Sequence, residues 1–170
     1  AIVQLTRAKE CMPENPAIYL SLGDAYFKIG VKPLAISNYQ KASELAPNNR
    51  DIQLKVARSL SSNKQYNDAI EAYIKAEKID STYPDPYLEH GRILVLAKFY
   101  KQAIPPLSRF VKLSPMHLEG SVLYAKGLFG YDLFGEAADA AKTSLQLDSN
   151  NVDIWRIRAF SLVDAKEAKD

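Results

Sequence analysis

The sequence repeats itself every 34 residues without an insertion or deletion. Small side chains recur at this spacing in two columns: Gly23, Ala57, Gly91, Ala125, Ala159; and Ala1, Ala35, Ala69, Ala103, Ala137. Large apolar side chains recur in the same phase: Tyr26, Leu60, Leu94, Leu128, Leu162. A chain of this kind folds as a stack, because each repeat buries its apolar face only against its neighbours.

Apolar residues within each repeat have helical spacing, and two helices fit the repeat length. In the first full repeat we expect helices at 16–29 and 33–46, antiparallel because only residues 30–32 join them. Gly23 lies inside the first of these helices, where a glycine costs about 0.5–1 kcal/mol relative to alanine. Since only small residues share its column, we interpret Gly23 as a packing residue where two helices approach closely.

The pattern Tyr19-x-x-Leu22-Gly23-x-x-Tyr26…Ala35…Tyr39-x-x-Ala42…Pro47 resembles the tetratricopeptide repeat. The resemblance implies an all-α fold: a right-handed α-solenoid superhelix of stacked antiparallel helix pairs, forming one array over residues 1–170. Residues 1–15 correspond to the second helix of a partial repeat, and residues 152–170 to the first helix of a further one. Four full repeats lie between them, at 16–49, 50–83, 84–117 and 118–151.

Two features of the third repeat depart from the pattern. Pro105 and Pro106 lie where its second helix should already be under way, and proline is tolerated only in a first turn. We therefore expect this helix to start late or to have a distorted first turn, leaving residues 100–104 partly irregular. Phe110 replaces a mostly small column, which predicts local repacking.

Composition narrows the function classes. Hydrophobic residues make up 47% of the chain and charged residues 25%, which is typical of a soluble folded protein. The net charge of +2 is close to balanced, so nothing in the composition indicates binding to nucleic acid. No apolar run is long enough to cross a bilayer, so no membrane insertion is expected, and the compartment stays open. A single cysteine, Cys11, and two histidines, His90 and His117, provide neither a zinc set nor a nucleophile–base arrangement. We therefore predict no catalysis, no metal and no cofactor.

The resemblance places a concave groove on the first helices of the repeats. Ten candidate partner-binding residues follow from its groove positions: Leu20, Asp24, Phe27, Leu54, Lys55, Arg58, Leu88, Arg92, Val122 and Lys126. They combine an aliphatic stripe with a basic series, and each has two interpretations. The aliphatic residues either contact a partner or pack between helices, and the cations either bind a partner or pair with acids on adjacent helices. Acidic residues in the first turns interact favourably with the positive end of the helix dipole: Asp51, Asp85, Glu119 and Asp153.

The best-known use of the family, a clamp of lysine and asparagine side chains for the C-terminal tail of chaperones, is absent. Its positions hold Leu20, Asp24, Lys55, Asp85 and Glu89. We therefore predict a protein–protein interaction module that binds a peptide or helical segment bearing apolar and acidic residues. RNA binding would need a larger basic excess.

A second hypothesis is a structural or self-assembly arm of a larger multidomain protein, for example the non-catalytic arm of an enzyme. The helix at residues 1–12 carries Val3, Leu5 and Cys11, which are apolar for the outer side of a terminal repeat. We expect a fragment of a longer array whose end helices can self-associate.

Overall fold

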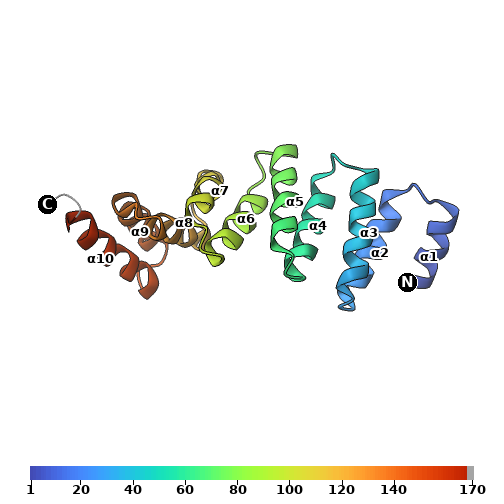
Figure 1. The fold of residues 1–170 in the computed structure, drawn as a ribbon, viewed down its shortest axis with the longest axis horizontal. Coiled ribbons are helices and arrows are strands. Elements are labelled where there is room, and N and C mark those ends of the chain that lie inside the picture. The colour runs from blue at the N-terminus through green and yellow to red at the C-terminus, as the bar shows by residue number, and fades with distance from the viewer. Residues whose placement is uncertain (168–170) are drawn as a thin grey trace. The chain divides into compact units, whose positions relative to one another are not determined.

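The computed structural model describes residues 1–167, which contain ten α-helices and no strand. These residues form two compact units (Figure 1). The N-terminal unit, residues 1–81, contains α1(Ile2–Cys11), α2(Pro16–Lys28), α3(Lys32–Leu45), α4(Arg50–Ser62) and α5(Tyr66–Ile79). The C-terminal unit, from residue 82 onward, contains α6(Asp85–Leu96), α7(Tyr100–Leu113), α8(Leu118–Gly130), α9(Phe134–Leu147) and α10(Val152–Glu167). The helices of the first full repeat, α2 and α3, start and end within one residue of the predicted bounds.

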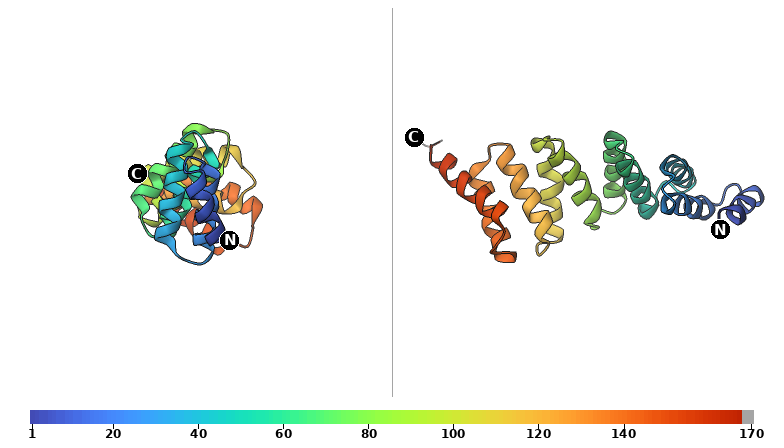
Figure 2. Two further views of the ribbon diagram at one scale, coloured as in Figure 1. Left: turned by 90° about the vertical axis from the view of Figure 1, so that its right-hand side faces the viewer. Right: turned by 90° about the horizontal axis from the view of Figure 1, so that it is seen from below.

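Consecutive helices form antiparallel hairpins within each unit (Figures 1 and 2). In the N-terminal unit α2 pairs with α3 and α4 with α5, while α1 packs on α2. In the C-terminal unit α6 pairs with α7 and α8 with α9, and α10 packs on both α9 and α8. We call the surface made by α2 and α4, or by α6, α8 and α10, the first-helix face of its unit. The surface made by α1, α3 and α5, or by α7 and α9, is the second-helix face.

The glycine in α2 has the packing role that the sequence predicts. Gly23 is buried, and a Cβ atom placed on it would lie 2.5 Å from the ring carbons of Tyr39 in α3. Gly91 in α6 has the same relation to Leu107 in α7, whose side chain a Cβ atom would overlap. Small residues in this column therefore let the two helices of a hairpin approach closely.

The prediction of an irregular start for the third repeat's second helix is wrong. Helix α7 begins at Tyr100 and continues through Pro105 and Pro106 to Leu113. Its first turn is regular, since the Ala103 amide donates to the Phe99 carbonyl at 3.0 Å. The prolines remove the intrahelical partners of the Lys101 and Gln102 carbonyls, and both of these residues are exposed to water. Burial of Ala103, Leu107 and Phe110 along the other side stabilises the helix against that loss.

The predicted repacking around Phe110 is an exchange of a large and a small side chain between two positions of the repeat. In the N-terminal unit Ala42 packs against Ile52. The residues 68 positions further on are Phe110 and Gly120, so the large side chain has moved from the first helix of a repeat to the helix before it. Phe110 is 2% exposed, and a Cβ atom on Gly120 would overlap its ring. His117 contacts that ring edge-on, with centroids 5.1 Å apart.

Candidate functional site

The first-helix face of the N-terminal unit has a pocket of about 380 Å³ between α2 and α4. Its lining residues are Asp24, Phe27, Lys28, Tyr39, Lys55 and Arg58. Asp24 organises the pocket, because its Oδ1 accepts hydrogen bonds from the Lys55 Nζ and the Tyr39 hydroxyl, both at 2.6 Å. The structure thus brings together four of the ten candidate residues in this pocket: Asp24, whose carboxylate is fixed by these hydrogen bonds, with Phe27, Lys55 and Arg58.

The Tyr39 hydroxyl stays protonated over an unusually wide pH range. Burial raises the pKa of Tyr39 well above its ordinary value, and the hydrogen bond to Asp24 and the charge of that carboxylate raise it further. Tyr39 therefore acts as a permanent donor that fixes Asp24 beneath Lys55.

This shift predicts a loss of stability in alkaline solution. Above about pH 10 the phenol ionises in the unfolded chain but keeps its proton in the folded one, so the free energy of unfolding falls as pH rises. We expect a Tyr39→Phe variant to lose less stability between pH 9 and pH 11 than the unsubstituted protein, in urea titrations at both values. Tyr66→Phe, at a 48% exposed position, serves as the control. Equal pH slopes for the unsubstituted protein and both variants would contradict this assignment.

The C-terminal unit carries the equivalent pocket, about 200 Å³ in volume, between α8 and α10. Its lining residues are Lys126, Phe129, Asp153, Arg156, Ile157 and Phe160. Four of these lie three repeats after a residue that lines the N-terminal pocket: Lys126, Phe129, Ile157 and Phe160 after Asp24, Phe27, Lys55 and Arg58. Phe160 is 53% exposed, so the pocket offers accessible aromatic surface.

Two members of the predicted basic series, Arg92 and Lys126, are each paired with a carboxylate on the first helix of the following repeat. Arg92 forms ion pairs with Glu119 and with Glu89, the latter at 3.2 Å, and Lys126 Nζ lies 3.4 Å from an Asp153 oxygen. Burial lowers the pKa of Arg92, but the hydrogen bond that its guanidinium donates to Glu119 and the charges of both glutamates outweigh this effect and raise the pKa overall. Of the two interpretations of the cations, pairing between adjacent helices is therefore observed at Arg92 and Lys126.

The aliphatic stripe is largely covered. Leu54 and Leu88 are 4% and 8% exposed. Leu20 and Val122 are half-buried and pack against core clusters of their own units. These side chains have the packing role that the sequence left open. The exposed apolar side chains that line the two pockets include Phe27 and Phe160.

Several pocket residues were absent from the ten candidates. Phe129, Ile157 and Phe160 occupy the same repeat positions as three candidates, so the 34-residue step was the signal that identifies them. Tyr39 lies on a packing column, and nothing in the sequence places its hydroxyl beside Asp24.

Among the residues that the structure describes, no group of three or more His, Cys, Asp or Glu side chains is arranged to hold a metal ion. None of the helices in that part of the chain has the length and apolar content to span a bilayer.

The comparisons agree with this architecture. A family model described as tetratricopeptide repeat matches residues 16–49 and 51–83, in the register of the first two full repeats. The chain contains tetratricopeptide repeats. It is 28% identical over 158 residues to the TPR repeat-containing protein YpiA of Bacillus subtilis, covering 89% of this chain. The matched region is only 36% of that relative's length, about a third.

Two solved structures are similar to this chain in fold. The crystal structure of YrrB, which is described as a TPR protein with an unusual peptide-binding site, aligns with a TM-score of 0.84 at 20% identity. That alignment covers 98% of this chain and 86% of YrrB. A crystal structure of MamA aligns with a TM-score of 0.82 at 21% identity, covering 91% of this chain and 85% of MamA. The fold class is therefore the predicted all-α solenoid. It supports a protein–protein interaction scaffold, and proteins of this family are in general non-catalytic interaction modules.

Proposed function

We propose that this tetratricopeptide repeat chain binds a peptide or helical segment of a partner protein on its first-helix face and catalyses no reaction. The observation that supports this most directly is the pair of equivalent pockets, one in each unit. Each pocket presents exposed phenylalanine surface beside an ion pair. Apolar anchors surrounded by polar groups are the usual composition of a peptide-binding site. YrrB, a structural neighbour, is described as having a peptide-binding site.

The charges of the pockets favour acidic partners. The N-terminal pocket holds Lys28, Lys55 and Arg58 against the single carboxylate of Asp24. In the C-terminal pocket, Lys126 and Arg156 face one carboxylate, that of Asp153. A partner segment with an aromatic or aliphatic side chain next to acidic residues fits both. A chaperone-type terminal carboxylate does not fit the N-terminal pocket, because Asp24 lies at a position where that clamp requires a neutral or basic group.

Selection of peptides from a random displayed library on the intact protein tests this proposal. Affinities of the selected peptides are then measured for Phe27→Ala and Arg156→Glu, which remove an apolar anchor and reverse a charge. We expect at least about a tenfold loss, equivalent to 1.4 kcal/mol, for peptides that use the altered pocket. Lys142→Glu on α9 is the control, since this exposed residue lies on the second-helix face. Selected peptides that bind both pocket variants with unchanged affinity would overturn the proposal.

Self-assembly is the second candidate function. It is favoured by apolar side chains that are about half or more exposed on the end helices: Val3 on α1, and Trp155, Leu162 and Val163 on α10. Sedimentation equilibrium distinguishes the two. A mass that rises with protein concentration, together with failure to select any peptide, would support assembly and contradict peptide binding.

A further inference from the structure

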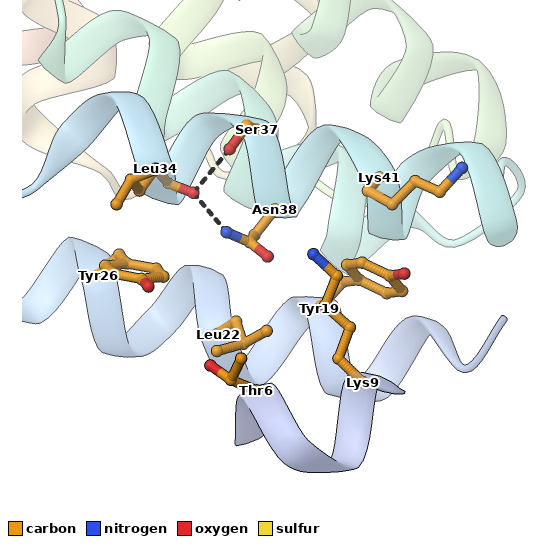
Figure 3. Close-up of a pocket in the computed structure, with 9 residues that line it drawn as sticks. All are labelled: Thr6, Lys9, Tyr19, Leu22, Tyr26, Leu34, Ser37, Asn38 and Lys41. Atoms are coloured by element: carbon orange, nitrogen blue, oxygen red, sulfur yellow. Dashed lines mark hydrogen bonds between the residues drawn. The ribbon is translucent and has the colours of Figure 1, made fainter. Parts of the chain in front are cut away.

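A second groove lies on the opposite side of the N-terminal unit from the pocket described above. It has a volume of about 400 Å³, with α2 as its floor and α1 and α3 as its walls (Figure 3). Thr6 and Lys9 come from α1, Tyr19, Leu22 and Tyr26 from α2, and Leu34, Ser37, Asn38 and Lys41 from α3. The groove therefore opens on the second-helix face, which the proposed function does not use.

The two ends of this groove differ in chemistry. Figure 3 shows Tyr26 and Leu34 at one end and Lys9, Tyr19 and Lys41 together at the other. Leu34 is 45% exposed, and Lys9 Nζ lies 5.3 Å from the centre of the Tyr19 ring. Lys41 has an ion pair with Glu44 at 3.0 Å, but both side chains are open to water, where such pairs contribute little. No carboxylate lines the groove itself.

Asn38 supplies a polar group midway between the two ends. Its Nδ2 donates to the Leu34 carbonyl at 2.7 Å, which orients the amide and leaves Oδ1 directed into the groove (Figure 3). A side-chain amide in this place matches the hydrogen-bonding pattern of an extended peptide backbone, since it offers an acceptor to a backbone N–H.

The next repeat contains the same groove with different chemistry. A cavity of about 430 Å³ lies between α3 and α5 over α4. Each residue that lines the first groove has its counterpart 34 positions further along. These counterparts are Gln40, Ser43, Gln53, Val56, Leu60, Asp68, Glu71, Ala72 and Lys75, and Glu44 joins them. The shape of the groove is thus a property of the repeat. It also occurs between α3 and α5, where a helical hairpin precedes the groove in the chain.

The side chains that define the first groove are missing from the second. Lys9, Tyr19 and Asn38 are replaced by Ser43, Gln53 and Ala72, and the apolar Leu34 by Asp68. The second groove contains three carboxylates and one lysine, whereas the first contains two lysines and no carboxylate. This contrast gives the first groove a charge preference that its own copy lacks.

We propose that the groove between α1 and α3 binds an extended acidic segment of a partner protein. Its apolar end takes a phenylalanine or leucine side chain over Tyr26 and Leu34. Lys9 and Lys41 pair with two carboxylates that follow in the segment, and Asn38 contacts the backbone between the apolar side chain and these carboxylates. A partner bound on the first-helix face leaves the groove between α1 and α3 accessible, so one chain can bind two segments at once.

Binding of a fluorescent peptide, measured by fluorescence anisotropy, tests this proposal. The peptide has blocked ends and carries a phenylalanine and a leucine followed by two glutamates. We expect the double variant Lys9→Glu/Lys41→Glu to weaken binding at least about tenfold, and Asn38→Ala to weaken it several-fold. Lys75→Glu, the counterpart of Lys41 in the second groove, should change the affinity by less than about twofold. Thermal denaturation monitored by circular dichroism checks that the variants fold, which is expected because both lysines are exposed.

Three results would overturn the proposal. The first is an equal loss of affinity in Lys75→Glu. The second is a loss of charge selectivity, seen either as equally tight binding of a peptide with lysines in place of the glutamates or as displacement of the peptide by single-stranded RNA at a lower concentration than unlabelled peptide requires. The third is a concentration-dependent mass that disappears in the double lysine variant, which would assign the groove to a second copy of the chain. Because this peptide also has the chemistry that suits the pockets of the first-helix face, all titrations use the Phe27→Ala/Arg156→Glu background, in which both of those pockets are weakened. Binding that persists in this background and is lost on adding Lys9→Glu/Lys41→Glu belongs to the groove between α1 and α3, so failure here is distinguishable from failure of the first-helix-face proposal.

Discussion

A Gly120→Ile variant is expected to lose about 3 kcal/mol or more of the stability of the C-terminal unit. The space beside Gly120 is filled by the ring of Phe110, which a Cβ atom would already overlap. A Phe110→Ala variant is expected to lose a similar amount, about 3–5 kcal/mol, because it leaves a cavity where a 2% exposed ring stood. Trp155, the single tryptophan, lies in α10 and reports unfolding of this unit by fluorescence.

The double variant Phe110→Ala/Gly120→Ile is expected to recover most of that loss, to within about 1 kcal/mol of the unsubstituted protein. It restores the pair that packs in the N-terminal unit, Ala42 with Ile52. The remaining cost is the lost edge-on contact with His117. Guanidinium titrations measure the free energies of unfolding of the single and double variants. If the losses from the two substitutions simply added, the side chains at positions 110 and 120 would not be filling the same space, and this interpretation would be wrong.

Alanine substitution is expected to have opposite effects at two helical glycines. Gly23→Ala should lower the free energy of unfolding by about 1–2 kcal/mol, because the overlap with the Tyr39 ring outweighs the gain in helix propensity. Gly23→Leu should cost more, since a larger side chain forces the Tyr39 hydroxyl away from Asp24.

Gly135→Ala in α9 is the matched control. A Cβ atom there meets nothing within 4 Å, so we expect this variant to gain about 0.5 kcal/mol from helix propensity alone. Urea titrations followed by circular dichroism at 222 nm measure both changes. A destabilised Gly135→Ala protein, or a stabilised Gly23→Ala protein, would show that close approach of α2 and α3 is not what requires the glycine.

Much of the fold could be predicted from the 34-residue register. A column of small residues and a column of large ones indicate a hairpin whose helices touch at fixed positions, and Gly23 against Tyr39 follows that rule. The Pro105–Pro106 prediction was wrong because it weighed only the local cost of proline. Burial of Ala103, Leu107 and Phe110 is a tertiary contribution that no local rule contains.

The candidate site was predictable only in part. Repeat position places Asp24, Phe27, Lys55, Arg58 and Lys126 on the first helices, and these residues do line the two pockets. Position alone leaves open whether Leu54 is covered or which carboxylate faces Lys126. Those answers depend on the neighbouring helix, which lies about thirty residues away in the chain.

The sequence by itself determined the helical hairpin, its length and the columns along which hairpins pack, because these follow from the periodic placement of small and large side chains. Tertiary structure alone decided which charges are paired, which aliphatic side chains are covered and where grooves remain open. The physical reason is that burial and ion pairing depend on distances between helices. A repeat register gives the order of the helices along the chain, but not the separation of their side-chain ends.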